Sequence, residues 1–226
     1  APRLHRGGQE FESLILHQVE YNESLLVRFF FIVKGRDNKM ASSAMHLAVA
    51  KKYLEKNKDK NFNYKKVMAG TLYPDAAKDK DKTHYTMSCR GNNLVTYLAS
   101  KVSLYDFLVE YEVVESFELG WFIHLVTDYL FFAECFSEEY LLTHSYEEFR
   151  RDLYFAYDCL EKYLSEKYKL MIDDYESYPS EYYEGILYRD SVLTKETIDS
   201  FIEKVSSINI EDYINKIKEA KRNVLP

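Results

Sequence analysis

The sequence is poor in the residues that make turns, with 7 glycines and 4 prolines among 226 residues. A fold of many short strands needs a turn wherever the chain reverses, so this scarcity disfavours an all-β protein. The abundance of Lys, Glu, Leu and Ala favours helices joined by few loops. We therefore predict an all-α fold.

Cysteine is scarce as well. Cys89, Cys135 and Cys159 are an odd number of thiols at wide spacing, and no two of them form a CxxC pair. This pattern excludes a full disulfide framework and a zinc knuckle built from thiolates. We interpret the three residues as reduced thiols of an intracellular protein.

An excess of positive charge and long apolar runs are also missing. The formal net charge is -7, which disfavours nucleic acid or an anionic membrane surface as the partner. No stretch reaches the roughly 18 apolar residues that a bilayer requires, so we expect no stable membrane insertion. The apolar run at 25–33 contains Arg28 and has no small-residue cleavage site after it, so it is a poor signal peptide. These absences predict a cytoplasmic protein.

Residues 1–39 differ from the rest of the chain. They contain a Gly-Gly pair, a β-leaning run of aromatic and aliphatic residues, and no clean helical period. Met40 and two serines then precede an amphipathic pattern, as at the start of a capped helix. We expect Met40 to be the natural start and residues 1–39 to be a leader that is not native; a true N-terminal element is the alternative. Residues 40–226 are expected to form a single domain.

The spacing of apolar residues predicts the positions of the helices. The expected helices span 44–57, 63–69, 92–100, 103–112, 115–134, 145–167, 194–204 and 210–222. Gly70 and Pro74 are expected to end regular structure, so that the stretch "GTLYPDAAKDKDKTHYT" forms a loop. The charge run at 78–82 is interpreted as solvated surface.

The apolar stretch "ELGWFIHLVTDYLFF" at 118–132 contains two polar side chains that are unexpected in a buried helix, His124 and Asp128. Residues at positions i and i+4 lie on one helix face, so both side chains can reach one ion or one hydrogen-bonding partner. The alternative is a buried His-Asp hydrogen bond that only organises the core.

Three further potential ligands precede this pair. His46 lies on an apolar helix face, where an unpaired imidazole would be costly, and Asp75 and His84 lie in the expected loop. Alternatively, Asp75 is a turn or capping residue and His84 is loop surface. Histidines and carboxylates around one point form a nitrogen and oxygen ligand set that suits zinc or a similar divalent ion.

The order of these pieces resembles a known family. A helix histidine, then "GTLYPD", then "THYT", then "LGWFIHLVTD" is similar to the zinc-dependent phospholipase C family and, more distantly, to the P1-type nucleases. The likeness covers roughly 40–170 and is greatest to intracellular bacterial members. It implies a single-domain helical bundle around a buried cluster of up to three zinc ions that cleaves phosphodiester bonds.

The resemblance also implies roles for individual residues. Asp75, His84, His124 and Asp128 match the ligands of one zinc, with Asp128 bridging to the next ion and Asp75 as the catalytic base. His46 matches the helix histidine of the neighbouring zinc. The family also holds that second ion with the N-terminal amine of the mature chain, whereas 45 residues precede His46 here.

A third zinc of the family is matched less closely. Glu134 stands where the family has a histidine, and His144 and Glu148 match a following HxxxE pair. Alternatively, Ser145 is a helix N-cap and Glu148 completes a capping box. Asp158 is another inward-pointing candidate, against an ordinary surface charge. We therefore expect two zinc ions and at most three.

The leading interpretation is a zinc-dependent phosphoester hydrolase that resembles phospholipase C and acts on a small or lipid phosphodiester. The alternative is a non-catalytic helical protein that keeps the fold and binds a metal or a partner. A phosphohydrolase of the HD type is disfavoured, because the chain has no adjacent His-Asp pair.

Overall fold

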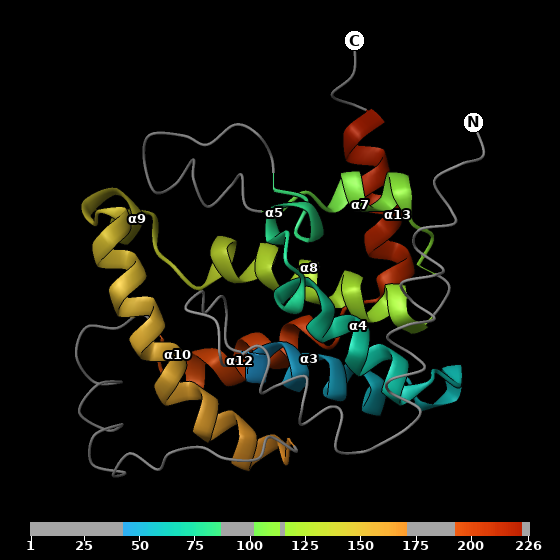
Figure 1. The fold of residues 1–226 in the computed structure, drawn as a ribbon, viewed down its shortest axis with the longest axis horizontal. Coiled ribbons are helices and arrows are strands. Elements are labelled where there is room, and N and C mark those ends of the chain that lie inside the picture. The colour runs from blue at the N-terminus through green and yellow to red at the C-terminus, as the bar shows by residue number, and fades with distance from the viewer. Residues whose placement is uncertain (1–42, 87–101, 114–115, 171–192, 223–226) are drawn as a thin grey trace.

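A computed structural model describes residues 43–86, 102–113, 116–170 and 193–222 of the chain. Within these ranges the regular structure is entirely helical, which confirms the all-α prediction (Figure 1). The elements are α3 (Ser43–Lys56), the 3-10 turn η1 (Lys58–Lys60), α4 (Tyr64–Ala76), α5 (Lys80–Thr83), α7 (Leu104–Glu110), α8 (Ser116–Glu134), α9 (Glu138–Thr143), α10 (Tyr146–Tyr168), α12 (Lys195–Val205) and α13 (Ile210–Arg222).

Most of the expected helices are confirmed to within a few residues, namely those at 44–57, 103–112, 115–134, 145–167, 194–204 and 210–222. The short helices α5 and α9 were not predicted. The helix expected at 92–100 and the leader at 1–39 lie outside the described residues. The expectation that the first helix is amphipathic is wrong for its first half, where residues 44–50 are all buried. The physical reason is that α3 packs against four helices, namely α4, α8, α10 and α12.

The predicted end of regular structure at Gly70 and Pro74 is also wrong, because α4 continues through both residues. Gly70 allows α4 to pack closely against α8 and does not end the helix. A Cβ atom on Gly70 would lie 2.0 Å from the carbonyl oxygen of Phe117, and a Cβ atom on Gly120 would lie 2.0 Å from that of Val67. Helices α4 and α8 therefore cross with their backbones in direct contact, which only two residues without side chains allow.

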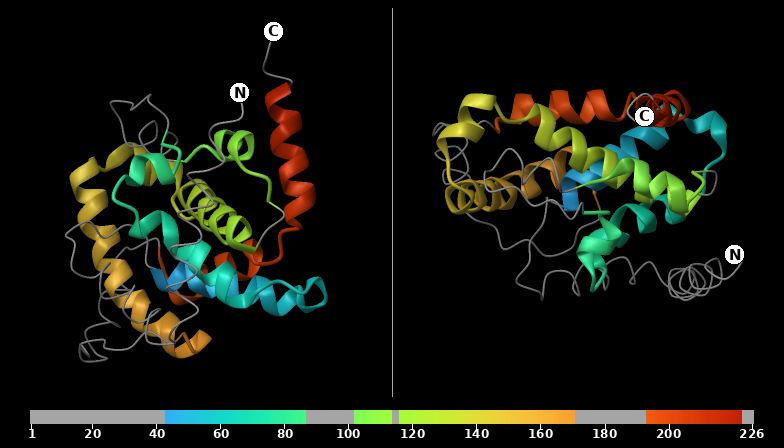
Figure 2. Two further views of the ribbon diagram at one scale, coloured as in Figure 1. Left: turned by 45° about the vertical axis from the view of Figure 1, so that its right-hand side comes forward. Right: turned by 90° about the horizontal axis from the view of Figure 1, so that it is seen from above.

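Helix α8 runs through the middle of the molecule, with α3 and α4 packed against it, α9 and α10 at one end and α13 beside α7 at the other (Figures 1 and 2). Its residues 119–128 are all buried. Polar groups on this part of α8 must therefore find partners within the protein. Among the described helices, none is both long and apolar enough to cross a membrane.

Candidate metal centre

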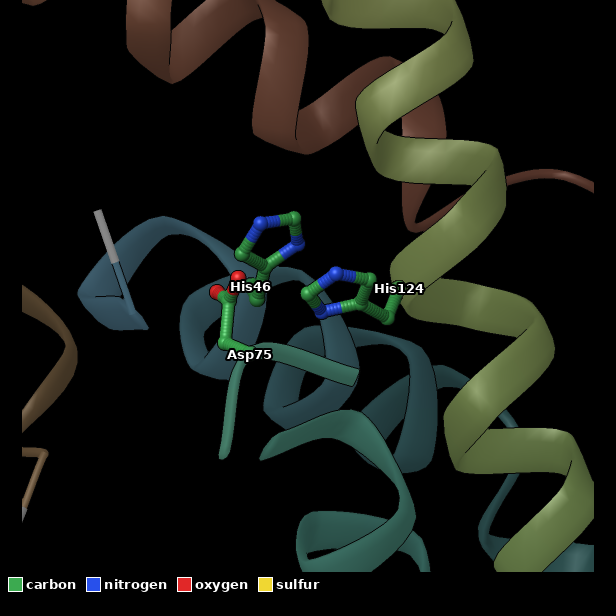
Figure 3. Close-up of side chains that lie close together, drawn as sticks. All are labelled: His46, Asp75 and His124. Atoms are coloured by element: carbon green, nitrogen blue, oxygen red, sulfur yellow. The ribbon is translucent and has the colours of Figure 1, made fainter. Parts of the chain in front are cut away.

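Five polar side chains meet in the interior where α3, α4, α5 and α8 come together. They are His46 on α3, Asp75 on α4, His84 at the C-cap of α5, and His124 and Asp128 on α8. None of the five is more than 7% exposed. Figure 3 shows three of them converging from three helices. The structure thus brings together the five residues that the sequence put forward for the first two ions, and we call them the polar cluster.

The closest contact in the polar cluster is between two imidazoles, whose Nε2 atoms on His84 and His124 are 3.1 Å apart. Asp128 lies beside both: its Oδ2 is 3.4 Å from Nε2 of His124 and 3.7 Å from Nε2 of His84. Asp75 Oδ1 is 3.5 Å from Nε2 of His84. The other Asp128 oxygen, Oδ1, is 3.3 Å from Nε2 of His46, whose ring stacks on that of His124.

Two backbone carbonyls fix the protonation of the facing imidazoles. Nδ1 of His124 donates to the Thr71 carbonyl at 2.8 Å, and Nδ1 of His84 donates to the Lys80 carbonyl at 2.8 Å. A carbonyl oxygen only accepts, so Nδ1 carries the hydrogen in both rings, and the Nε2 of a neutral ring then presents a lone pair. Two lone pairs at 3.1 Å repel each other unless a proton or a metal cation lies between them.

Several atoms of the polar cluster have no hydrogen-bond partner among the described residues: both ring nitrogens of His46, Oδ1 of Asp75 and Oδ1 of Asp128. Each such buried atom costs on the order of 1–3 kcal/mol if nothing replaces its contact with water. The alternative in which His124 and Asp128 only share a core hydrogen bond does not account for these atoms. Bound cations would account for the two carboxylate oxygens and for one of the two His46 nitrogens.

The spacing of the cluster fits zinc. A tetrahedral zinc with bonds of about 2.0–2.1 Å places neighbouring ligand atoms about 3.3 Å apart. Four of the six distances among the Nε2 atoms of His84 and His124 and the facing oxygens of Asp75 and Asp128 run from 3.1 to 3.7 Å. Two overlapping triads of potential ligands occur here in the described part of the chain, one with His46, Asp75 and His124 and one with His84, His124 and Asp128. A donor set of imidazole and carboxylate suits zinc.

Charge within the polar cluster keeps its carboxylates ionised. Burial opposes ionisation of Asp128, but His46 and then His124 outweigh it and hold the pKa of this carboxyl well below its usual value. Burial likewise opposes ionisation of Asp75, whose pKa is nevertheless lowered by its contact with His84 and by the other nearby histidines. Both residues are therefore anionic at neutral pH, which is the form that binds a metal.

The two facing imidazoles differ in their preference for a proton. Burial, followed by the nearby His46, lowers the pKa of His124, so this ring stays neutral. Burial also disfavours charge on His84, but Asp75 and Asp128 overcome this effect and raise the pKa of His84. His84 is thus the ring of the two that binds a proton more readily, and a metal ion would compete with that proton.

The helices hold these ligands through contacts between their backbones. The close crossing at Gly70 brings the Thr71 carbonyl to His124. The Trp121 indole donates to the Thr83 carbonyl at 2.9 Å, and the Thr83 hydroxyl donates to the Pro74 carbonyl at 3.0 Å. The end of α5, and with it His84, is therefore tied to both α4 and α8.

The residues predicted for a third ion lie elsewhere. Glu134 pairs with Lys204 at 2.6 Å, and His144 donates from Nδ1 to the Tyr140 carbonyl at 3.0 Å. Glu148 forms the capping box with Ser145 that was the alternative prediction, and this alternative is confirmed. None of the three belongs to a group of potential ligands in the described part of the chain. The third ion stays a prediction, and the side chain of Asp158 lies outside the described residues.

Two residues near the polar cluster were missed from the sequence. Lys80 belongs to the charge run that was interpreted as solvated, yet its Nζ lies 3.9 Å from Oδ1 of Asp75. Its position four residues before His84, one helical turn away, was the available signal.

The second residue is Tyr157 on α10, which is buried, and its hydroxyl has no hydrogen-bond partner among the described residues. Burial and then the charge of Asp128 hold the pKa of Tyr157 well above its usual value, so the phenol keeps its proton. Nothing in the sequence distinguished it from the other tyrosines.

Comparison with protein families matches residues 43–217 to the model of the family described as zinc dependent phospholipase C. The matched stretch contains all five residues of the polar cluster and extends through most of α13. The comparisons with curated proteins and with solved structures found no match.

Proposed function

The chain belongs to the zinc-dependent phospholipase C family, and from this premise we propose that it is a zinc-dependent hydrolase of small or lipid phosphodiesters. Family membership supports phosphoesterase chemistry. One structural observation carries the proposal further. The Nε2 atoms of His84 and His124 face each other at 3.1 Å beside two buried carboxylates, an arrangement that a divalent cation stabilises.

We assign the ligands from the observed contacts. His84, His124, Asp75 and one oxygen of Asp128 would hold the first zinc. His46 and the other oxygen of Asp128 would contribute ligands to a second zinc. When bound, such ions supply Lewis acidity toward a phosphoryl oxygen and toward a water molecule.

The side chains of the polar cluster have distinct tasks in this proposal. His84 and His124 are held by carbonyls at Nδ1, so their Nε2 lone pairs are already aimed inward and little reorganisation is needed. Asp75 is anionic and lies beside the partly exposed Lys80 side chain, from which water can approach it, so it can take a proton from entering water. We assign it the role of catalytic base.

Metal content tests the centre directly. Protein purified without chelators should carry about two zinc ions per chain by plasma mass spectrometry, as expected if both proposed sites are filled. His124→Ala and Asp128→Asn should lower that number. His144→Ala is the matched control, because this histidine lies outside the polar cluster, and it should leave the zinc content unchanged. Circular dichroism of each variant is needed, since metal binding also stabilises the fold.

Activity is measured with a chromogenic phosphodiester and a panel of phospholipid head-group esters. Hydrolysis that disappears in Asp128→Asn and persists in His144→Ala supports the proposed enzyme. Protein that binds no zinc even when zinc is added would refute the metal centre. Zinc-loaded protein that cleaves none of the esters would favour a non-catalytic member of the family.

A further inference from the structure

The charge run at 78–82 does not point uniformly to solvent. Lys78 and Lys82 are exposed, whereas Lys80 between them is partly buried with its side chain 23% exposed. Its Nζ lies 3.9 Å from Oδ1 of Asp75, which is an ion-pair distance for that pair of atoms. One lysine of the run thus reaches the edge of the polar cluster.

Both the backbone and the side chain of Lys80 contact residues of the polar cluster. Its backbone carbonyl accepts from Nδ1 of His84 and orients that ring. Because this contact comes from the backbone, replacement of the side chain leaves it in place. The ammonium group therefore has a separate role, which substitution can test without removing the support of His84.

The ammonium lies between solvent and one carboxylate of the polar cluster. The side chains of Asp75 and Asp128 are both 6% exposed, whereas the side chain of Lys80 is 23% exposed. A ligand that approaches Asp75 from the Lys80 side therefore meets the ammonium group. Lys80 stands beside Asp75 with a flexible stem of four carbons and three donors on its ammonium group.

The charge balance at this edge favours an anionic ligand. The cluster contributes two carboxylates, which one divalent cation already neutralises. A second divalent cation would leave the polar cluster itself with net positive charge, although Asp79 and Asp81 flank Lys80 at the surface. When Asp75 binds a metal ion, its carboxylate oxygen is less available as an acceptor for the Lys80 ammonium. A phosphate oxygen of a ligand could then accept a hydrogen bond from Lys80 in its place.

We propose that the Lys80 ammonium binds a phosphate oxygen of the substrate at the edge of the metal centre and so selects a phosphodiester over uncharged esters. This inference rests on the proposed function for the identity of the substrate. The contact itself needs only the metal-loaded centre and a phosphate group. Lys80 is then a substrate-binding residue of this chain, in addition to the five residues of the polar cluster.

The test compares Lys80→Met with Lys82→Met, which removes the same charge from an exposed position of the same helix. Binding of inorganic phosphate to the zinc-loaded proteins is measured by titration calorimetry, after plasma mass spectrometry has shown equal zinc content. Loss of a charge-assisted hydrogen bond should weaken binding by about tenfold or more in Lys80→Met. Lys82→Met should match the parent protein, and Lys80→Arg should recover much of the affinity because it keeps a cationic donor.

Steady-state kinetics with the chromogenic phosphodiester separates this inference from the proposed function. A contact made in both ground state and transition state raises KM in Lys80→Met with little change in kcat. If the parent protein hydrolyses no ester but phosphate binding still depends on Lys80, the contact stands and the enzyme proposal fails. If the parent protein is active but Lys80→Met and Lys82→Met bind phosphate equally well, the contact is overturned and the enzyme proposal stands. Failure of the zinc-loaded parent protein to bind millimolar phosphate also overturns the contact.

Discussion

The close crossing of α4 and α8 leads to a quantitative prediction for Gly70→Ala. In an ordinary helix interior this substitution stabilises a protein by up to about 1 kcal/mol, because alanine has the higher helix propensity. Here the new Cβ atom would lie 2.0 Å from the Phe117 carbonyl oxygen, whereas ordinary contact begins at 3.4 Å. The shortfall is about 1.4 Å, and the obstructing atom belongs to the backbone and cannot rotate away.

The helices must therefore move apart, and the cost follows from that movement. Overpacking in a well-packed core costs about 1–3 kcal/mol, and a clash between backbones lies at the upper end of this range. After the gain in propensity, Gly70→Ala should lower the free energy of unfolding by about 2 kcal/mol. Gly120→Ala should have a similar effect, because its Cβ atom would meet the Val67 carbonyl oxygen at the same distance of 2.0 Å.

The same movement should weaken the metal centre. Thr71 follows Gly70, and its carbonyl holds Nδ1 of His124 at 2.8 Å. A helix shift of about 1 Å would lengthen this contact beyond a hydrogen bond. Loss of a group that orients a metal-binding histidine typically lowers metal affinity by about 10- to 100-fold. We expect a zinc affinity of Gly70→Ala reduced within that range.

Urea unfolding at a fixed free zinc concentration measures the stability change, and competition with a chelator measures the zinc affinity. Lys65→Ala is the control, since this residue is exposed on the same helix and its loss should change stability by no more than about 0.5 kcal/mol. A Gly70→Ala protein as stable as its parent, with unchanged zinc affinity, would refute the inferred contact between the two backbones.

Three further predictions concern side chains outside the polar cluster. Tyr157→Phe should raise the free energy of unfolding by about 1 kcal/mol, because it removes a buried hydroxyl that has no partner among the described residues; a loss of stability on urea unfolding would mean that the hydroxyl does have a partner. Ser145→Ala should destabilise the protein by about 1 kcal/mol through loss of the α10 cap. Glu148→Gln should leave zinc content by plasma mass spectrometry unchanged, because the carboxylate belongs to that cap, and loss of one zinc would show that it is a ligand instead.

Much of the site was predictable because its signals are local in sequence. His124 and Asp128 lie one helical turn apart in an apolar stretch, and periodicity alone places both on one buried face. The apolar neighbours of His46 likewise predicted that its imidazole points inward, and it is 1% exposed. These residues could be found because their spacing determines their direction.

The parts that were not predicted depend on contacts between distant segments. Gly70 is typical of a helix end in a single sequence, and only the approach of Phe117 from α8 shows why it lies inside α4. Lys80 could not be told from Lys78 and Lys82 by composition, because its distinction is its distance from Asp75. The predicted ligand role of Glu148 shares its sequence pattern with a capping box; the local hydrogen bonds form that box, and the ligand role stays a prediction.

The scaffold and the polar cluster support the same conclusion about metal binding. A cluster designed only to stabilise the core would pair each buried donor with an acceptor, yet His46 has no hydrogen bond at either ring nitrogen among the described residues. Meanwhile the Nδ1 atoms of His84 and His124 are fully paired, so that only their Nε2 atoms remain for the interior. The Nδ1 atoms of these two rings, which face away from the centre of the cluster, thus have their hydrogen bonds. Several atoms that face the centre of the cluster lack them among the described residues. This asymmetry is what a metal centre requires, because the outer partners orient the ligands and the cation completes the inner contacts.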